Sequence, residues 1–226
     1  MKIAQRLRRL LRPPGDLTND LPVRPLSEAF GYDRGTPIDR FYIDRFLRDR
    51  QARIRGRVLE VAGNEYTEKF GSGAVQSMEL YTQETSRPGG FTGDLTDMAT
   101  LPASKVDCFI CTQTFNFIYD FKAAIRGAHH LLAAGGTLLA TVGGVSQISR
   151  FDMDRWGDYW RFTSASCERT FGEFFAEVEV VTFGNLLAAT AMIRGLAVED
   201  LPSPEVLEPS DNNYQVIVGI AARKST

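Results

Sequence analysis

The segment SQISRFDMDRWGDYWRFT, residues 146–163, gathers carboxylates, guanidinium groups and aromatic rings, and it holds both tryptophans of the chain. Aromatic planes beside such charges suit a polar, ring-bearing substrate, here called the acceptor, such as a sugar or a glycosylated metabolite. A carboxylate next to an acceptor hydroxyl can also take its proton as a general base. The favoured bases are Asp154 and Asp158, and the candidate acceptor contacts are Arg155, Trp156, Tyr159 and Trp160. A structural interpretation stays open, in which the rings roof a sheet and the charges pair on the surface.

A second stretch that could bind a ligand is GRVLEVAGNEYTEKFG, residues 56–71, which begins like the first strand and turn of a nucleotide-binding domain. A turn that binds the pyrophosphate of a dinucleotide needs the spacing G-x-G-x-x-G, because the backbone must approach the phosphates without a Cβ in the way. The turn between Glu60 and Tyr66 has one glycine, Gly63. The sequence therefore disfavours NAD or FAD and favours a ligand without phosphates.

From Gly56 onward, short apolar runs alternate with longer amphipathic ones, which is typical of strands joined by crossover helices in a largely parallel sheet. The predicted strands are 57–61, 75–80, about 89–93, 106–111, 136–142, 177–183 and 214–222, and the predicted helices are 65–71, 120–133, 163–175 and one within 184–197. Gly135 and Gly136 are expected to stop a helix and turn the chain into the fifth strand. The last strand could insert antiparallel beside the sixth. Ligands bind such sheets at the carboxyl ends of the strands.

Two amphipathic helices are predicted ahead of this region. Residues 2–12 place apolar side chains on one face and most basic ones elsewhere, so this helix could pack on the domain or touch an acidic membrane surface or partner. The second helix begins within GTPIDRFYIDRFLRDR, residues 35–50. We expect Thr36 to cap it, Pro37 to be its first residue and Asp39 to return a bond as in a capping box.

Composition and charge exclude several classes of protein. The chain of 226 residues is 43% hydrophobic, which suffices for one sizeable core. Its net charge of -2 gives no global positive field, so nucleic acid is not expected as a partner. The apolar runs are too short to span a bilayer and no export signal is visible, so we expect a cytoplasmic protein without a transmembrane segment.

The cysteines and histidines do not indicate a metal or redox site. Cys108 and Cys111 fall in a predicted strand and should point to opposite faces, which argues against a redox or zinc pair. His129 and His130 are adjacent on a predicted helix and diverge by about 100°, so they cannot hold one metal together. We expect a metal-independent protein.

Several of these stretches resemble the class I SAM-dependent methyltransferases, from Gly56 to about Lys224. VLEVAGNEYT resembles the family's first strand and SAM loop, an acidic residue followed by G-x-G-x-G, with Ala62, Asn64 and Tyr66 at the three glycine positions. GDLTD at 93–97 resembles the acidic turn that meets the adenine. VDCFICTQTFNFIYDFKAAIRGAHHLLAAGGTLLATV is similar to the strand, helix, double glycine and strand that follow, as in small bacterial methyltransferases of glycan or secondary-metabolite type.

The resemblance implies an α/β, Rossmann-like sheet of seven mostly parallel strands, with an N-terminal helical extension or lid over residues 1–55 and a SAM-binding methyltransferase domain over residues 56–226. Asn64 can adopt a left-handed backbone in place of glycine, whereas Tyr66 offers a ring near the sulfonium or adenine. The implied SAM-binding residues are Glu60, Ala62, Gly63, Asn64, Tyr66, Glu79, Asp94, Leu95, Thr112, Gln113, Thr114 and Arg40. Arg40 could pair with the methionine carboxylate or with a neighbouring helix, and Asn116 could contact the acceptor.

We therefore expect an enzyme that transfers a methyl group from SAM to an oxygen, less favourably a nitrogen, of a small polar acceptor such as a sugar or secondary metabolite, leaving S-adenosylhomocysteine. A homodimer is compatible with the sequence. Two alternatives stay open. One is a methyltransferase-fold protein that catalyses a cyclisation or elimination, and the other is a non-catalytic partner protein that acts through its basic first helix.

Overall fold

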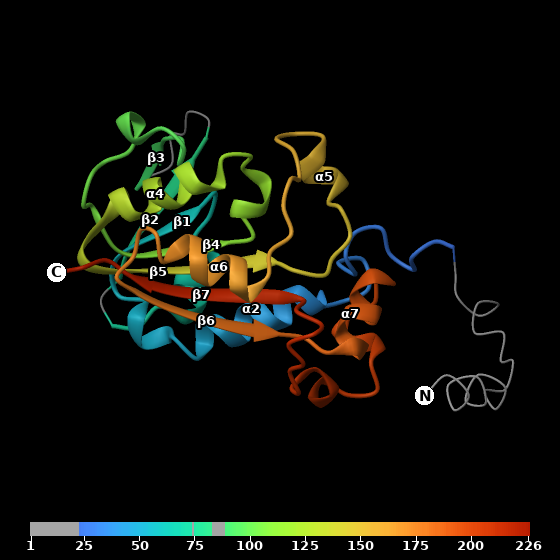
Figure 1. Cartoon of the computed structure of the whole chain (residues 1–226). Helices are drawn as coiled ribbons and strands as arrows, with labels where there is room; N and C mark the ends of the chain where they lie inside the picture. The colour runs from blue at the N-terminus through green and yellow to red at the C-terminus, as the bar shows by residue number, and fades with distance from the viewer. Residues whose placement is uncertain (1–22, 74, 83–88) are drawn as a thin grey trace, which may run out of the picture.

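The computed structural model describes residues 23–73, 75–82 and 89–226, and a seven-stranded sheet lies at its centre (Figure 1). The strands follow the order β3-β2-β1-β4-β5-β7-β6. β7 pairs antiparallel with β5 and with β6, and the other pairs are parallel. The strands are β1 (Gly56–Val61), β2 (Val75–Tyr81), β3 (Gly90–Thr92), β4 (Val106–Thr112), β5 (Leu132–Gly143), β6 (Glu177–Phe183) and β7 (Ile217–Arg223). The predicted mostly parallel sheet with an antiparallel last strand is confirmed.

Helices cover both faces of this sheet. α4 (Phe121–Leu131) and α6 (Ser164–Phe171) pack on one face, and α2 (Ile38–Arg48), α3 (Glu65–Phe70) and α7 (Leu186–Ile193) pack on the other. α5 (Arg150–Met153) stands apart in the segment that follows β5 (Figure 1). The short 3-10 helices are η1 (Gln51–Arg53), η2 (Met98–Thr100), η3 (Phe115–Phe117), η4 (Val198–Asp200) and η5 (Pro204–Leu207).

Successive residues of the central strands enter opposite cores, as the two-residue period of a strand requires. In β4, Cys108 lies in the core on the side of α2, whereas Phe109 and Cys111 lie in the core on the side of α4. The two cysteines therefore point to opposite faces, as predicted. Burial raises the pKa of both thiols to about 12.

The start of β5 differs from the prediction. Helix α4 ends at Leu131 and β5 begins at Leu132, so the helix stops before the double glycine instead of at it. The distant Lys224 explains the early stop, because its ammonium donates to the carbonyl oxygens of His129 and Leu132, 2.9 and 2.7 Å away. Gly135 instead takes a left-handed backbone, φ 71°, within the strand.

The start of α2 also differs from the prediction. Pro37 is the N-cap of α2 and not its first helical residue, and no side chain donates or accepts a capping hydrogen bond there. Thr36 is instead held by the carboxylate of Glu199, which accepts from its backbone N–H at 2.7 Å and from its hydroxyl at 2.8 Å. Asp39 is buried and accepts from the backbone N–H of Arg40 at 2.8 Å, so the capping box is wrong. A tertiary contact replaces the local cap.

Residues 23–37, the N-terminal strap, lie beside α7 and precede α2 (Figure 1). The backbone N–H of Leu26 donates to the carbonyl oxygen of Arg194, and Arg34 donates two hydrogen bonds of 2.7 Å to Asp200. The Gln147 amide donates to the carbonyl oxygen of Glu28, at 3.2 Å, and so joins the strap to the segment that follows β5. The predicted helix at residues 2–12 lies outside the described residues.

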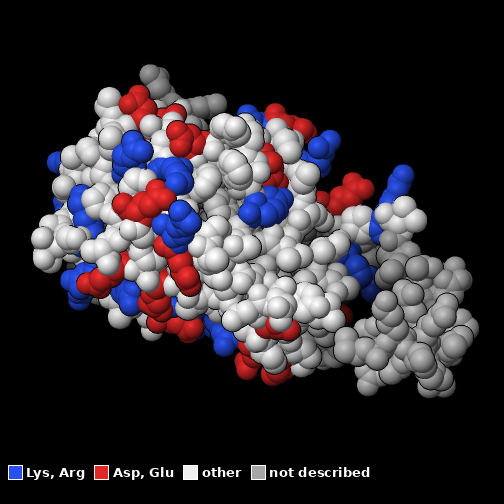
Figure 2. Space-filling model, viewed as in Figure 1, with Lys and Arg blue, Asp and Glu red and all other residues white. Residues whose placement is uncertain are grey.

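Acidic and basic side chains intermingle on the face shown in Figure 2, in keeping with a net charge of -2. Among the helices that the structure describes, none has the length and apolar character needed to cross a membrane.

Candidate functional site

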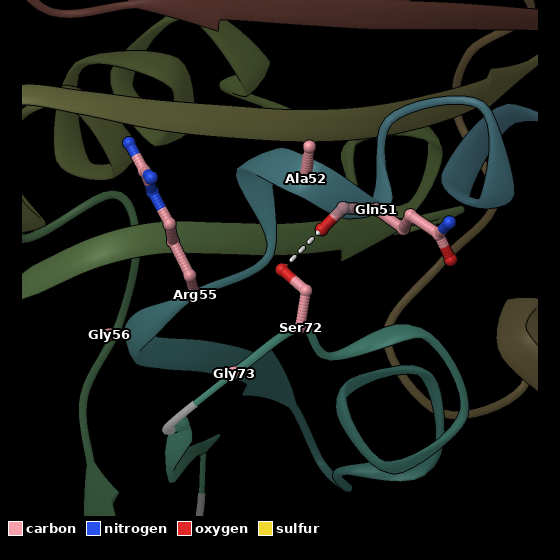
Figure 3. Close-up of a pocket in the computed structure, with 6 residues that line it drawn as sticks. All are labelled: Gln51, Ala52, Arg55, Gly56, Ser72 and Gly73. Atoms are coloured by element: carbon pink, nitrogen blue, oxygen red, sulfur yellow. Dashed lines mark hydrogen bonds between the residues drawn. The ribbon is translucent and has the colours of Figure 1, made fainter.

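Two cavities lie at the amino ends of the strands. One of about 570 Å³ is lined by Gln51, Ala52, Arg55, Gly56, Ser72 and Gly73 (Figure 3). The other, of about 890 Å³, runs along the starts of β1, β4 and β5. Sheets of this topology bind ligands at the opposite, carboxyl ends of the strands. The residues that follow β1 to β5 therefore form the candidate site.

The turn after β1 is organised by Glu60, which is buried. Its carboxylate accepts from the backbone N–H of Tyr66 at 3.1 Å, from the backbone N–H of Thr67 at 2.7 Å and from the Thr67 hydroxyl at 2.6 Å. These bonds satisfy free N–H groups at the start of α3, where the helix dipole favours a negative charge. Burial raises the pKa of Glu60, although the hydrogen bonds oppose this rise. Glu60 thus fixes the shape of the turn.

The left-handed residue of this turn is Ala62, with φ 56°, and not Asn64, with φ -142°. The expectation for Asn64 is corrected because this residue precedes α3 as its N-cap, and its side-chain amide donates to Glu68 at 2.9 Å. A Cβ placed on Gly63 would meet no atom within 4 Å. The backbone at Gly63 therefore borders open space that a ligand can approach.

Arg40 of α2 lies against the same turn. Its guanidinium donates to the hydroxyl oxygen of Tyr66 at 3.0 Å and lies over the ring of Tyr32, 5.9 Å from its centroid. The Nε atom is buried and has no hydrogen-bond partner among the described residues, and a carboxylate oxygen of Asp39 lies 3.8 Å from it. A buried donor of this kind is costly unless an acceptor completes it. The Arg40 side chain as a whole is 32% exposed, so it is accessible beside the turn.

The ring of Tyr66 stacks on Phe70, with centroids 6.4 Å apart and planes 12° apart, and packs against the core on the side of α2. Burial raises the pKa of its phenol, against the influence of Arg40. The ring is thus held by packing and by one hydrogen bond, while the space beside Gly63 stays open.

Two predicted carboxylates lie at the carboxyl ends of β2 and β3. Glu79, near the end of β2, accepts a hydrogen bond from the hydroxyl of Tyr81. Asp94, after β3, accepts from the backbone N–H and the hydroxyl of Thr96 at 2.7 and 2.8 Å. Asp94 is exposed at the surface of its turn.

Leu95 anchors the turn after β3 to α4. Its side chain is buried, and its carbonyl oxygen would lie only 2.0 Å from a Cβ placed on Gly127. Glycine at position 127 is therefore what allows α4 to approach this turn so closely.

The turn after β4 carries a second left-handed residue, Gln113, with φ 48°. Its backbone N–H donates to the carbonyl oxygen of Thr141 at 2.8 Å, and the Thr114 hydroxyl donates to the carbonyl oxygen of Thr112 at 3.0 Å. β1 and β4 are neighbours in the sheet, so the strained residues Ala62 and Gln113 follow adjacent strands. Backbone strain of this kind concentrates at functional sites.

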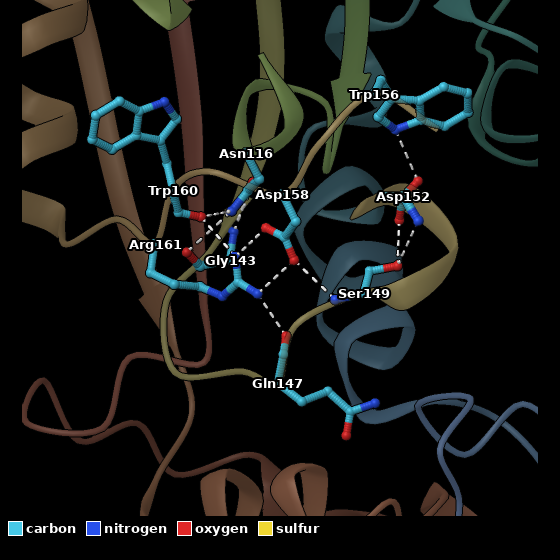
Figure 4. A network of polar contacts seen from close by, with 9 residues as sticks. All are labelled: Asn116, Gly143, Gln147, Ser149, Asp152, Trp156, Asp158, Trp160 and Arg161. Carbon is cyan, nitrogen blue, oxygen red and sulfur yellow. Dashed lines mark hydrogen bonds and ion pairs between the residues drawn. The ribbon is translucent and has the colours of Figure 1, made fainter. Parts of the chain in front are cut away.

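Asn116 ties the turn after β4 to the segment after β5 (Figure 4). Its side-chain oxygen accepts from the N–H of Gly143 at 3.2 Å, and its amide donates to the carbonyl oxygen of Trp160 at 2.9 Å. Its own carbonyl oxygen accepts from the N–H groups of Tyr159 and Trp160. Asn116 is 2% exposed, so this predicted acceptor contact has its amide committed to internal bonds.

Asp158 forms an ion pair with Arg161 within the segment after β5 (Figure 4). Its carboxylate accepts from Arg161 at 2.5 and 2.9 Å and from the backbone N–H of Ser149 at 2.9 Å. Burial alone would raise its pKa, but these hydrogen bonds and the charge of Arg161 outweigh burial, and the pKa of Asp158 is lowered. Arg161 also donates to the carbonyl oxygen of Gln147 at 2.6 Å. The pair clamps both ends of the loop that contains α5.

The remaining predicted residues lie on the outside of this loop. Asp154 is exposed, and within the described part of the chain no side chain bonds its carboxylate. Arg155 lies over the ring of Phe151, 3.4 Å from its centroid, and the indole N–H of Trp156 donates to Asp152 at 3.1 Å. Of the two predicted bases, Asp154 is therefore the one with a free carboxylate.

The two histidines diverge as predicted. The ring of His129 packs edge-on against Phe175, with centroids 5.1 Å apart, while Nε2 of His130 lies 3.3 Å from the carbonyl oxygen of Leu101. Within the residues described, no three His, Cys, Asp or Glu side chains come together as a metal site requires.

The interpretation in which the charges of residues 146–163 pair with one another applies to Asp158, which Arg161 and the backbone of Ser149 hold, although this pair is buried and not on the surface. Tyr119, which contributes an exposed ring beside Trp160, was not singled out from the sequence. The proximity of Arg161 to Asp158, three residues apart, was the one local signal for the clamp.

Sheet order, strained turns after β1 and β4 and an open glycine at the first turn together define a class I methyltransferase fold. Residues 55–140 match the family described as methyltransferase domain. This match runs from the residue before β1 into β5, and the described sheet has the class I methyltransferase fold. No curated protein matches the chain.

Solved structures share this fold at low sequence identity. A SAM dependent methyltransferase from Archaeoglobus fulgidus is 11% identical, with a TM-score of 0.53 over 81% of this chain and 94% of that one. The (4+2) cyclase SpnF is 15% identical, with a TM-score of 0.55 over 89% and 88%. An S-adenosylmethionine dependent methyltransferase from Mesorhizobium loti is 13% identical, with a TM-score of 0.51 over 83% and 98%. At these identities the likeness shows the fold alone.

Proposed function

We propose that the protein transfers a methyl group from SAM to an oxygen of a small polar acceptor. The observation that carries this proposal is the turn after β1, where Gly63 borders open space and the partly exposed guanidinium of Arg40 lies alongside, bonded to Tyr66. A carboxylate held by Arg40 and a ligand backbone passing over Gly63 fit the amino-acid part of SAM. Asp94 and Leu95 would flank the adenine, and Glu79 the ribose.

When bound, SAM supplies an electrophilic methyl group, so the chain mainly has to align the acceptor and exclude water. The turn Thr112–Gln113–Thr114 borders the reacting end in this arrangement. We place the acceptor between this turn and the segment after β5, which the clamp of Asp158 and Arg161 holds in place. Asp154, with its free carboxylate, is the favoured general base for an acceptor hydroxyl. Asp158 acts as a positioning residue.

Calorimetry with SAM and S-adenosylhomocysteine tests the proposal. Replacing Arg40 by Met removes the charge but keeps an unbranched side chain, and it should weaken SAM binding by about 10- to 100-fold, because a hydrogen bond to a charged group contributes about 1.5–3 kcal/mol. Arg48→Met is the matched control, since Arg48 lies on the same helix and is exposed. Equal affinities of the two variants would remove Arg40 from the site. Folded wild-type protein that binds neither ligand would rule out methyl transfer.

The second candidate is a cyclisation or elimination in which SAM is bound but not consumed. The likeness to SpnF, a cyclase with the same fold, supports keeping it. Mass spectrometry of the product separates the two: methyl transfer adds one methylene unit to the acceptor and yields S-adenosylhomocysteine, whereas the alternative leaves SAM intact.

A further inference from the structure

Two exposed rings, Tyr119 and Tyr159, lie together with the partly buried ring of Trp160 at the edge of the candidate site, and we call these three rings the aromatic platform. The ring centroid of Tyr119 lies 5.4 Å from that of Tyr159 and 5.9 Å from that of Trp160. Tyr119 is 70% exposed and Tyr159 is 48% exposed. Exposed large rings gathered in this way are uncommon on a soluble surface and mark binding sites.

The platform is fixed by the fold and is not a loose loop. The indole N–H of Trp160 donates to the carbonyl oxygen of Tyr119 at 3.1 Å, and its ring packs edge-on against Phe121 at 5.3 Å. The backbone of both Tyr159 and Trp160 is bonded to Asn116. The indole of Trp160 and the backbone of Tyr159 are therefore held in place when no ligand is bound, which lowers the entropy cost of binding.

Gly157 allows the ring of Tyr159 to take its position in the platform. Its backbone is left-handed, with φ 97°, and a Cβ at this position would lie 2.3 Å from the ring of Tyr159. Only glycine lets the ring lie this close to the chain. In Figure 4 the indole of Trp160 points away from the ion pair of Asp158 and Arg161, and so it takes no part in the clamp.

We propose that the platform binds a pyranose ring, so that the acceptor is a glycan or a glycosylated molecule. The apolar C–H face of a pyranose complements the electron-rich face of an aromatic ring, and its hydroxyls need polar partners at the ring edges. The phenols of Tyr119 and Tyr159 supply these, since no residue that the structure describes accepts a hydrogen bond from either. This inference rests on the proposed methyl transfer, of which it names the substrate class.

Continuity with the reacting end favours a carbohydrate over an apolar surface. Asn116 joins the platform to the turn after β4, so a sugar stacked on the rings lies next to the residues that border the methyl group. A rigid aromatic patch with free hydroxyls at its rim matches a ring that is apolar on one face and polar at its edge.

The two tryptophans make a direct test possible. Trp156→Phe leaves Trp160 as the only tryptophan of the chain, and its fluorescence then reports on the platform. The full-length variant is first applied to a printed array of bacterial oligosaccharides and is then titrated with the free form of the strongest binder, with methyl glucoside and with adenosine. We expect a saturable change in Trp160 fluorescence with the oligosaccharide and a smaller or no change with adenosine.

Ring removal completes the test. In this background Tyr119→Ala should weaken oligosaccharide binding at least about tenfold, equivalent to about 1.4 kcal/mol. Phe151→Ala is the matched control, because Phe151 is an exposed ring of the same segment outside the platform, and it should leave the affinity unchanged. No binding on the array, a response to adenosine alone, or equal affinities of the two variants would overturn the proposal. SAM calorimetry on the same proteins separates the two failures: loss of SAM binding would refute methyl transfer, not the sugar site.

Discussion

Asp158→Asn should destabilise the protein, because it breaks the clamp of the loop after β5. The Asp158 side chain is 0% exposed and accepts three hydrogen bonds, two of them from Arg161, whose side chain is 29% exposed. The asparagine side chain keeps one acceptor oxygen, but an N–H₂ group replaces the other oxygen and faces a hydrogen-bond donor. Removing one partner of a buried ion pair costs about 3–5 kcal/mol, and partial exposure of Arg161 reduces this to about 2–3 kcal/mol.

Thermal and urea unfolding at pH 7 measure this loss. For a protein of this size, 1 kcal/mol shifts the melting temperature by about 2–4 °C, so the drop should be about 4–12 °C. Asp154→Asn is the matched control, because Asp154 is exposed and its carboxylate has no partner among the described side chains. Its effect should stay within about 0.5 kcal/mol. If Asp154 is the base, this stable variant loses methyl transfer.

The pH dependence provides an independent check. The pKa of Asp158 is lowered in the folded protein, because the bonds from Arg161 and Ser149 outweigh burial. A carboxyl group whose pKa is lowered by folding contributes stability above its unfolded pKa of about 3.9 and loses this contribution as the pH falls through its folded pKa. The difference between wild type and Asp158→Asn should therefore be constant from about pH 5 to 8 and shrink below about pH 4. Equal stabilities at pH 7, or a difference that widens in acid, would refute the clamp.

Three further predictions follow from backbone geometry and burial. Ala62→Gly should stabilise the protein by about 0.5–1 kcal/mol in urea unfolding, because it relieves a left-handed alanine, and a loss of stability would contradict the turn as described. Gly127→Ala should cost at least about 2 kcal/mol in the same assay, since its methyl group would lie 2.0 Å from the carbonyl oxygen of Leu95, and the gain usual for alanine in a helix would show that α4 lies farther away. The three buried cysteines, with pKa values raised to about 12, should react with a thiol reagent at pH 8 only after unfolding, and fast labelling of native protein would disprove their burial.

The sheet could be predicted because strands buried on both faces give continuous apolar runs, and topology then places the residues after each strand on one edge. Glu60, Asp94 and Gln113 lie there as the sequence indicated. The ends of α2 and α4 could not be predicted. They depend on Glu199 and Lys224, which are distant in the sequence and reach the helix ends only in the folded chain.

Within the candidate site, residue types were easier to predict than roles. Asp154 and Asp158 look alike in the sequence, but only Asp158 meets Arg161 and a backbone N–H in a buried position. The commitment of Asn116 to Gly143 and Trp160 likewise depends on how two turns from different strands dock. Propensity and spacing carry no information on such docking. The sequence therefore indicated which residues lie near the site but did not distinguish residues that contact a ligand from residues that hold the loops in place.

The insertion of β7 between β5 and β6 orders events during synthesis. The ribosome completes β6 well before β7, and in the described sheet β6 has β7 as its neighbour. β1, β2 and β4 can pair while the chain is still growing. β6 has no strand to pair with until β7 has left the exit tunnel. A nascent chain stalled in that interval would present the apolar edge of β5 to chaperones.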